Sequence, residues 1–201
     1  MWFRNLQIYR LPKNWASNAS QLEEKLSSLT LLSCGGGDSR SIGWVAPCPA
    51  GSLVHAVNRQ WLLALGIEEK LLPASVVRQF ADERATAIEE NEGRRVGRKE
   101  MRELRDAMTS ELLPRAFVRR RTTFGWIDPV NGWLVIDAAA PARAEEFVEH
   151  LRKAVDSLPV RLLKTTQSPS AAMTGWVADG EAPGGFTIDQ DLELRSAEQA
   201  K

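Results

Sequence analysis

The sequence predicts an α+β fold, in which pieces of antiparallel sheet pack with helices and a basic helical hairpin projects from them. Two observations lead to this class. Short segments rich in alternating apolar, β-branched and aromatic residues lie on both sides of the middle of the chain, as in antiparallel sheets. The middle itself carries two apolar stripes at helical spacing, separated by glycines and basic residues. A chain of 201 residues is long enough to bury a real core around these elements.

The N-terminal part is expected to begin with a strand and a helix. Residues 2–11 include apolar side chains in a strand-like pattern. Ser20 and Glu23 have the spacing of a capping box, which predicts a helix that opens there and ends near residue 29. A glycine-rich loop then leads into a short strand over residues 42–46.

A hairpin of two strands is expected next, over residues 53–57 and 60–67. The two apolar runs are joined by only Asn58 and Arg59. Two-residue connections are the commonest links between antiparallel strands. We therefore expect the chain to reverse at Asn58-Arg59 and the flanking strands to pair.

Two helices should follow, over residues 73–92 and 99–113. Their apolar residues recur at helical spacing, and Gly93 and Gly97 interrupt the pattern between them. This arrangement predicts a helical hairpin, which we call the finger, with its tip at residues 92–98.

The rest of the chain should return to strands and helices. The expected elements are strands at 115–128, 133–137 and 160–163, helices at 142–158 and 171–178, and a further strand at 186–188. The predicted regions are 1–72, an N-terminal α/β region; 73–114, the finger; and 115–201, a second α/β region.

The charge of the chain is balanced overall but unevenly distributed. Lysine plus arginine and aspartate plus glutamate both number 26. Between residues 94 and 121, however, ten basic residues face four acidic ones, a net charge of +6. A polarised protein of this kind can steer an anionic ligand.

Part of this charge lies in an apolar strand, which is unusual. The strand over residues 115–128 carries Arg115 and the consecutive Arg119, Arg120 and Arg121. Successive strand residues point to opposite faces, so the triplet puts charge on both. Guanidinium forks match phosphate oxygens in pairs, and duplex DNA is the natural polyphosphate. Phosphate binding is therefore predicted here, whereas the basic helix could equally be a solvated face with internal ion pairs.

Residues that could perform catalysis form only one recognisable pattern. Glu68 and Lys70 match the E-x-K half of a metal-dependent nuclease site. Such a site needs another carboxylate, and the candidates are Asp38 in the glycine-rich loop and Asp137 downstream. The two cysteines and two histidines have no zinc-site spacing. No metal, cofactor or catalytic residue is expected.

Four stretches of the sequence resemble a known family. MWFRNLQIYRL, EEKLLPASVVRQ, ELLPRAFVRRRTTF and LRKAVDSLPVRLL occur in this order, and together they resemble the recombination-associated RdgC family of bacteria. The resemblance implies a sequence-nonspecific double-stranded DNA-binding protein whose two subunits close into a ring around the duplex. It also implies antagonism of the RecA recombinase by competition for DNA. The family has been called a putative exonuclease, but no complete nuclease motif in this sequence supports that activity, so the chain is not expected to be an enzyme.

The resemblance also implies roles for particular residues. The basic fingertip of the family falls at Arg94, Arg95 and Arg98, with Lys99 adjacent. The arginine of the L-L-P-R-A-F block is Arg115, and the strand analysis adds Arg119 as a DNA contact. Phe117 matches a family residue that packs at a subunit contact, which predicts a homodimer. Family members are longer, so the chain resembles a short, C-terminally truncated member, for which ring closure is an open question.

Two other classes of function remain open. One is a metal-dependent DNA exonuclease that uses Glu68 and Lys70. The other is an oligomerisation or inhibitor module whose arginines meet an acidic protein rather than DNA.

The expected location follows from what the sequence lacks. The N-terminus has no apolar core of a signal peptide, and no apolar run approaches the roughly 18 residues of a membrane span. The protein is therefore expected in the cytoplasm, associated with the nucleoid, with no membrane partner.

Overall fold

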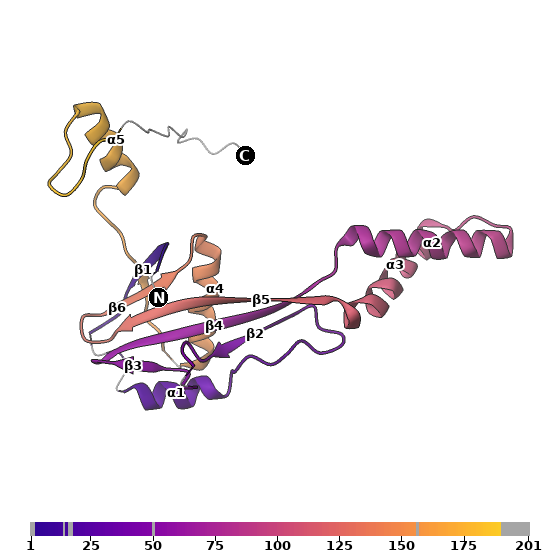
Figure 1. Ribbon diagram of the computed structural model, residues 1–201, viewed down its shortest axis with the longest axis horizontal. Helices are drawn as coiled ribbons and strands as arrows, with labels where there is room; N and C mark the ends of the chain where they lie inside the picture. The colour runs from indigo at the N-terminus through magenta and orange to yellow at the C-terminus, as the bar shows by residue number, and fades with distance from the viewer. Residues whose placement is uncertain (1–2, 14, 16–17, 50, 156, 190–201) are drawn as a thin grey trace. The chain divides into compact units, whose positions relative to one another are not determined.

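The computed structural model describes residues 3–13, 15, 18–49, 51–155 and 157–189. The chain divides into two compact units, Met1–Leu162 and Leu163–Lys201. The first unit contains a seven-stranded sheet in which every strand pairing is antiparallel (Figure 1). The predicted α+β class is confirmed.

The sheet has the order β2-β4-β5-β6-β1-β7, and β3 pairs with β4 beside β2. Its strands are β1 (Leu6–Arg10), β2 (Arg40–Val45), β3 (His55–Val57), β4 (Gln60–Leu71), β5 (Phe117–Asp128), β6 (Trp133–Asp137) and β7 (Arg161–Leu162). The helices of the first unit are α1 (Ala19–Ser27), α2 (Ala74–Glu92), α3 (Arg98–Leu112), the short 3₁₀ helix η1 (Leu113–Arg115) and α4 (Pro141–Ala154). The longest strands, β4 and β5, pair along their length although they flank α2 and α3 in the sequence.

The main core lies between the sheet and helices α1 and α4. Leu26 of α1 and Phe147 of α4 are fully buried in one cluster with strand residues such as Leu63 and Ile127. Gly125 of β5 lets Phe147 approach the sheet, because a Cβ atom at Gly125 would lie 2.3 Å from Phe147 Cζ. A glycine inside a strand commonly marks such a close approach.

The β3–β4 hairpin turns where the sequence predicts. Asn58 and Arg59 have φ angles of 49° and 64°, and Val57 pairs with Gln60. Positive φ at both central residues is the geometry of a type I′ turn, whose twist matches that of the flanking strands. The predicted hairpin is confirmed.

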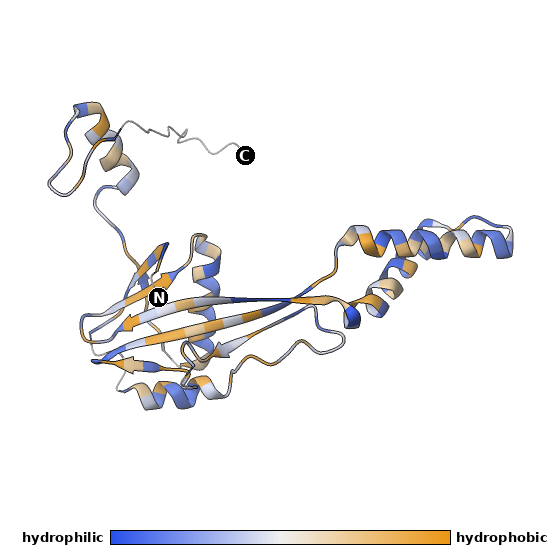
Figure 2. Cartoon of the chain, viewed as in Figure 1, coloured by the Kyte–Doolittle hydropathy of each residue, from blue (hydrophilic) through white to orange (hydrophobic). Residues whose placement is uncertain are grey.

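Helices α2 and α3 form a helical pair with a small core of its own. Val77, Ala81 and Met108 are buried there, and Leu104 and Leu112 pack against them. Gly93, with φ 64°, ends α2 in the left-handed conformation that favours glycine. Figure 1 shows that α2 continues from β4 and that α3 returns through η1 to β5, and Figure 2 shows hydrophilic and hydrophobic residues interleaved along both helices.

Several predicted boundaries were wrong. Asn18, not Ser20, caps α1, because its side-chain oxygen accepts a hydrogen bond from the backbone N–H of Gln21 at 2.8 Å. Helix α4 ends at Ala154 rather than residue 158. Strand β1 begins only at Leu6, and Trp2, where the strand was predicted to start, lies outside the described residues.

The second unit contains one described helix, α5 (Pro169–Asp179), two residues longer at its N-terminus than predicted. Ser168 caps it by accepting from the N–H of Ala171 at 3.1 Å. The rings of Trp176 and Phe186 lie 5.2 Å apart. The prediction of a strand at residues 186–188 is wrong, because those residues do not form a strand. In the part of the chain that the structure describes, no helix is long and apolar enough to cross a membrane.

Candidate nucleic-acid interface

The turn between α2 and α3 is organised by one arginine. Arg94 donates two hydrogen bonds to Glu100, both at 2.7 Å, and a third to Glu92 at 2.6 Å. The bond to Glu100, and then that to Glu92, raises the pKa of Arg94, while Arg94 lowers the pKa of Glu100. The backbone N–H of Val96 is held by Glu89 at 2.8 Å. Arg94 therefore shapes the tip, and its charge is already balanced by carboxylates.

The other three predicted fingertip residues are open to solvent. Arg95 and Arg98 are exposed, and neither side chain pairs with any described residue. Lys99 is 92% exposed, and its ammonium lies 3.9 Å from Glu103 one helical turn away. Exposed pairs of this kind contribute little and exchange readily for other anions. These three cations, which we call the tip cations, are available to a ligand.

The arginine triplet of β5 has internal partners on β4. The register sets Arg119 opposite Glu69 and Arg120 opposite Glu68. Arg120 Nε donates to Glu68 at 2.7 Å, and Glu69 accepts from Arg119 at 2.9 Å and from Arg121 at 3.1 Å. The sequence predicts phosphate binding by the triplet, but in the fold two carboxylates of β4 already neutralise most of its charge.

A residual positive charge nevertheless remains on this part of β5. Arg119 and Arg121 share the single carboxylate of Glu69. Their guanidinium groups lower the pKa of Glu69, the hydrogen bond from Arg119 most strongly. Arg119 is half exposed, so one of the two arginines can still turn toward an anion. Arg115, in η1, is exposed and its side chain pairs with no described residue.

The predicted DNA contacts therefore form two groups rather than one. Of the tip cations, Arg95 precedes α3 and Arg98 and Lys99 are its first two residues, whereas Arg115 and Arg119 follow its end. The two groups thus lie at opposite ends of α3, a helix of 15 residues, which is about 22 Å long at a rise of 1.5 Å per residue. A ligand that touches both groups must itself be extended and carry repeated negative charge.

Phe117 stands beside the second group. It is the first residue of β5 and 85% exposed. Its cross-strand neighbour Leu71 and the next residue, Val118, are also exposed. Phe117 and Leu71 lie side by side on one face of the β4–β5 ribbon, and Val118 lies on the other face. Phe117 and Leu71 therefore form an exposed apolar pair at the end of the ribbon, which is a candidate contact surface.

The E-x-K pair holds the glycine-rich loop. Glu68 is almost fully buried and accepts from the backbone N–H of Cys34 at 2.9 Å. That bond, followed by the one from Arg120, lowers the pKa of Glu68. Lys70 Nζ donates to the carbonyl oxygens of Gly35 and Gly36 at 2.7 and 3.1 Å. Both side chains thus act on the loop backbone, which gives each a structural role.

Asp38 and Asp137 have backbone partners elsewhere. Asp38 accepts from the N–H of Gly35, and Asp137 from those of Arg4 and Asn5. No group of three or more histidine, cysteine, aspartate or glutamate side chains among the described residues could hold a metal ion.

Sequence reasoning missed the acidic partners of the triplet. In the sequence, Glu68 stands out only as part of the nuclease pattern, and the pairing of Glu68 and Glu69 with arginines depends on the β4–β5 register. One signal in the sequence could have suggested these ion pairs. Glu68 and Glu69 are adjacent, as are the three arginines, and cross-strand pairs of opposite charge are favourable.

Comparison with known proteins shows to which family the chain is related. A model of the family described as "Putative exonuclease, RdgC" matches residues 1–201. A "Recombination-associated protein RdgC" of Herminiimonas arsenicoxydans is 53% identical over 201 residues, which is all of this chain and 67% of that protein. Proteins of the same name from Dechloromonas aromatica (strain RCB) and Bordetella pertussis are 49% and 50% identical over the whole chain, which covers 66% and 67% of them. The chain thus spans about two thirds of the length of these relatives, and it belongs to the RdgC family.

Proposed function

We propose that this chain binds double-stranded DNA without sequence preference and acts in recombination by occupying DNA that RecA would otherwise use. The observation that carries the proposal is the set of tip cations at the α2–α3 turn, where Arg95 and Arg98 have no carboxylate partner among the described residues. Arg115 and the half-exposed Arg119 supply a second contact about one helix length away. An extended polyanion fits this spacing.

Sequence preference is not expected from such contacts. The candidate residues are lysines and arginines on a turn and at a strand end, and such side chains position a protein on phosphates without reading bases. Binding to the nucleoid would follow from affinity for any duplex.

The salt dependence of binding tests the proposal. If the three tip cations and Arg115 each neutralise one phosphate, log K should fall against log salt with a slope of about −3.6 per bound subunit, at roughly −0.9 per phosphate. The measurement is fluorescence anisotropy of two duplexes of equal length and unrelated sequence over a salt series. A flat salt response, or a clear preference for one duplex, contradicts the proposal.

Competition with RecA can be separated from direct contact with RecA. Increasing amounts of the chain should reduce RecA assembly on a limiting amount of DNA. Adding more DNA should restore assembly, because free DNA relieves competition but not a protein–protein block. Inhibition that persists in excess DNA contradicts this part of the proposal.

We further propose that the chain is not an enzyme, although the family description contains the word exonuclease. The support is the engagement of Glu68 and Lys70 with the loop at residues 34–36. Linear duplex should stay intact during incubation with the protein and Mg²⁺. Degradation that Glu68→Gln abolishes would establish the nuclease instead.

A further inference from the structure

A pocket lies where the end of β4 meets the first turn of α2 and the last turns of α3. Its volume is about 380 Å³. The lining residues are Ser39, Lys70, Leu72, Ala74, Val77, Arg78, Arg105, Thr109 and Leu113. Four of these are aliphatic and none is aromatic. The pocket is separate from the tip cations, which lie at the other end of α3.

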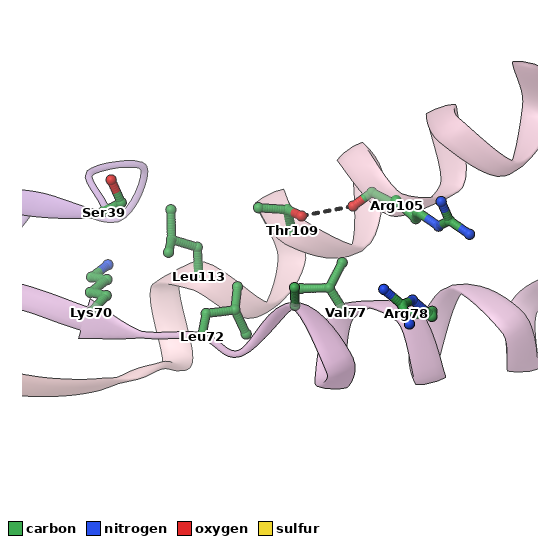
Figure 3. Close-up of a pocket in the computed structure, with 9 residues that line it drawn as sticks. Ser39, Lys70, Leu72, Val77, Arg78, Arg105, Thr109 and Leu113 are labelled. Carbon is green, nitrogen blue, oxygen red and sulfur yellow. Dashed lines mark hydrogen bonds between the residues drawn. The ribbon is translucent and has the colours of Figure 1, made fainter. Parts of the chain in front are cut away.

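The lining is arranged by polarity. Figure 3 shows Leu72, Val77 and Leu113 in the middle, Ser39 and Lys70 toward one end, and Arg78 and Arg105 toward the other. The Lys70 ammonium is held by the carbonyl oxygens of Gly35 and Gly36. The pocket therefore has an apolar centre with a cationic group at each end.

The two arginines at one end of the pocket are free to bind an anion. Arg78 and Arg105 are both exposed, and within the described parts of the chain neither guanidinium has a hydrogen bond or ion pair. Acidic residues are near in sequence, such as Asp82 one turn after Arg78 and Asp106 next to Arg105, but neither forms a pair with them. Two arginines that line one end of a pocket repel each other, and an anion bound between them relieves this repulsion.

We propose that this pocket binds an acidic peptide segment of a partner protein. An aliphatic side chain of the peptide lies between Leu72, Val77 and Leu113, and a neighbouring carboxylate is held by Arg78 and Arg105. Charge complementarity and the aliphatic centre together select this ligand. A sugar-phosphate backbone has no branched alkyl group to fill the centre, because its CH and CH₂ groups are flanked by oxygens, and a nucleobase favours an aromatic stacking partner, which the lining lacks.

The test uses the purified full chain and a fluorescein-labelled pool of hexapeptides in which Asp or Glu alternates with Leu, Ile or Val. A first matched pool carries Asn and Gln in place of the acids, and a second carries Ser in place of the aliphatic residues. Fluorescence anisotropy should show saturable binding of the acidic–aliphatic pool alone. Absence of saturable binding, or equal binding of either matched pool, overturns the proposal.

Substitutions of the pocket arginines test whether the peptide binds in this pocket. Arg78→Gln and Arg105→Gln should each weaken binding of the acidic–aliphatic pool about tenfold or more, because each removes a charge-assisted hydrogen-bonding group. Arg84→Gln and Arg102→Gln are the controls, since both arginines are exposed on the same helices outside the pocket. They should leave binding within about twofold. An equal loss in the controls means that general positive charge, not this pocket, attracts the peptide, and overturns the proposal.

Measuring DNA binding by the same variants distinguishes the proposed peptide site from the proposed DNA-binding surface. The double variant Arg78→Gln with Arg105→Gln should lose the peptide but keep wild-type affinity for duplex DNA. Saturating duplex should likewise leave the peptide bound. If the double variant loses DNA and peptide together, or if duplex displaces the peptide, the pocket is part of a nucleic-acid surface and the proposal is wrong.

Discussion

Glu68 illustrates how a single residue can suggest chemistry in the sequence and serve structure in the fold. Its side chain is 4% exposed and is shared between the N–H of Cys34 and the guanidinium of Arg120. A buried carboxylate needs such partners, because an unpaired charge away from water is costly. Glu68 therefore links the glycine-rich loop, β4 and β5 at one point. Its ion pair with Arg120 stabilises the fold and needs no ligand.

Asp128 provides a residue-scale prediction about pH. It is buried in the β5–β6 turn and accepts hydrogen bonds from Val130 N at 3.0 Å and from Asn131 N and Nδ2 at 3.0 and 2.7 Å. Burial raises the pKa of Asp128, but the bonds from Asn131 and Val130 outweigh burial, so the pKa lies below its ordinary value. Such a group stabilises the fold above its ordinary pKa of about 4, and this contribution is lost as the pH falls through the lower folded-state pKa.

Asp128→Ala should therefore cost about 1–3 kcal/mol of stability at pH 7, and the difference from wild type should shrink as the pH falls below 4. Chemical denaturation at a series of pH values measures this. Asp82→Ala, on an exposed turn of α2, is the control and should change stability little at any pH. A deficit for Asp128→Ala that stays constant down to the lowest pH would show that the carboxylate acts through shape and not charge.

At the scale of elements, the finger separates two uses of arginine. Arg94 is bound to Glu92 and Glu100 and fixes the turn, whereas the tip cations face solvent. Changing Arg95, Arg98 and Lys99 together to Ala should leave the helices intact, because exposed charges add little to stability. It should weaken DNA binding and reduce the salt slope by about 2.7, the share of three phosphates.

The matched control for that variant changes three exposed arginines elsewhere on the same helices. Arg78→Ala, Arg84→Ala and Arg102→Ala together remove equal charge and should leave the salt slope close to wild type. If both triple variants lose DNA binding equally, the net charge of the finger is responsible and the assignment to the tip is wrong. Salt titrations of the three proteins on one duplex distinguish these outcomes.

The contact between β5 and α4 gives a second prediction about elements. A methyl group at Gly125 would meet the ring of Phe147, which is fully buried. Gly125→Ala should therefore destabilise the first unit by about 1–3 kcal/mol, the usual cost of overpacking a core. Gly36→Ala, where nothing lies within 4 Å of the added atom, should change stability by less than about 0.5 kcal/mol. Equal denaturation midpoints for the two variants would mean that α4 moves away from the sheet at little cost.

Elements whose signals are local could be predicted from the sequence. The turn at Asn58-Arg59, the strand β6 and the helix break at Gly93 all agree with the structure, since each depends on a few adjacent residues. Helix ends were predicted less accurately, because α1 is capped by Asn18 and not by Ser20.

The pairing of β4 with β5 could not be predicted in the same way. The whole of α2 and α3 separates these strands, so no tight turn sets their register, and a shift of one residue would exchange the faces of every side chain. The partners of Arg119 and Arg120 depend on that register. The pocket between β4, α2 and α3 was missed for the same reason, because its lining residues are adjacent only after folding.

At the scale of the whole molecule, the net charge is zero, but the basic residues fall into two sets, one paired with carboxylates and one exposed. Much of the basic charge between residues 94 and 121 is balanced by carboxylates on β4 and at the finger tip. The remaining cations alone would be weak contacts for the proposed DNA ligand. A protein that holds duplex DNA through few phosphates gains from joining two copies, because the second copy binds at high effective concentration. Self-association is therefore the property on which DNA occupancy should depend most.

Phe117 is the residue on which to test self-association. It is 85% exposed, so Phe117→Ser should leave the subunit as stable as before. In a two-fold dimer the same residue contributes from both copies, and each copy would lose about 1.5–3 kcal/mol of apolar burial. A homodimer built on this contact should therefore dissociate at concentrations at least about 100-fold higher than those at which wild type dissociates. Val57→Ser, an exposed apolar change at the opposite end of the β3–β4–β5 ribbon, should have no such effect.

Sedimentation velocity of the three proteins over a wide concentration range measures this directly, and DNA binding adds a second observable. Phe117→Ser should lose affinity for DNA through loss of pairing, so its salt slope per bound subunit should stay that of wild type while the concentration dependence becomes non-cooperative. A wild type that dimerises while Phe117→Ser dimerises equally well would place the subunit contact elsewhere. The apolar pair of Leu71 and Phe117 would then have no part in self-association, and the tip cations would have to account for DNA binding one subunit at a time.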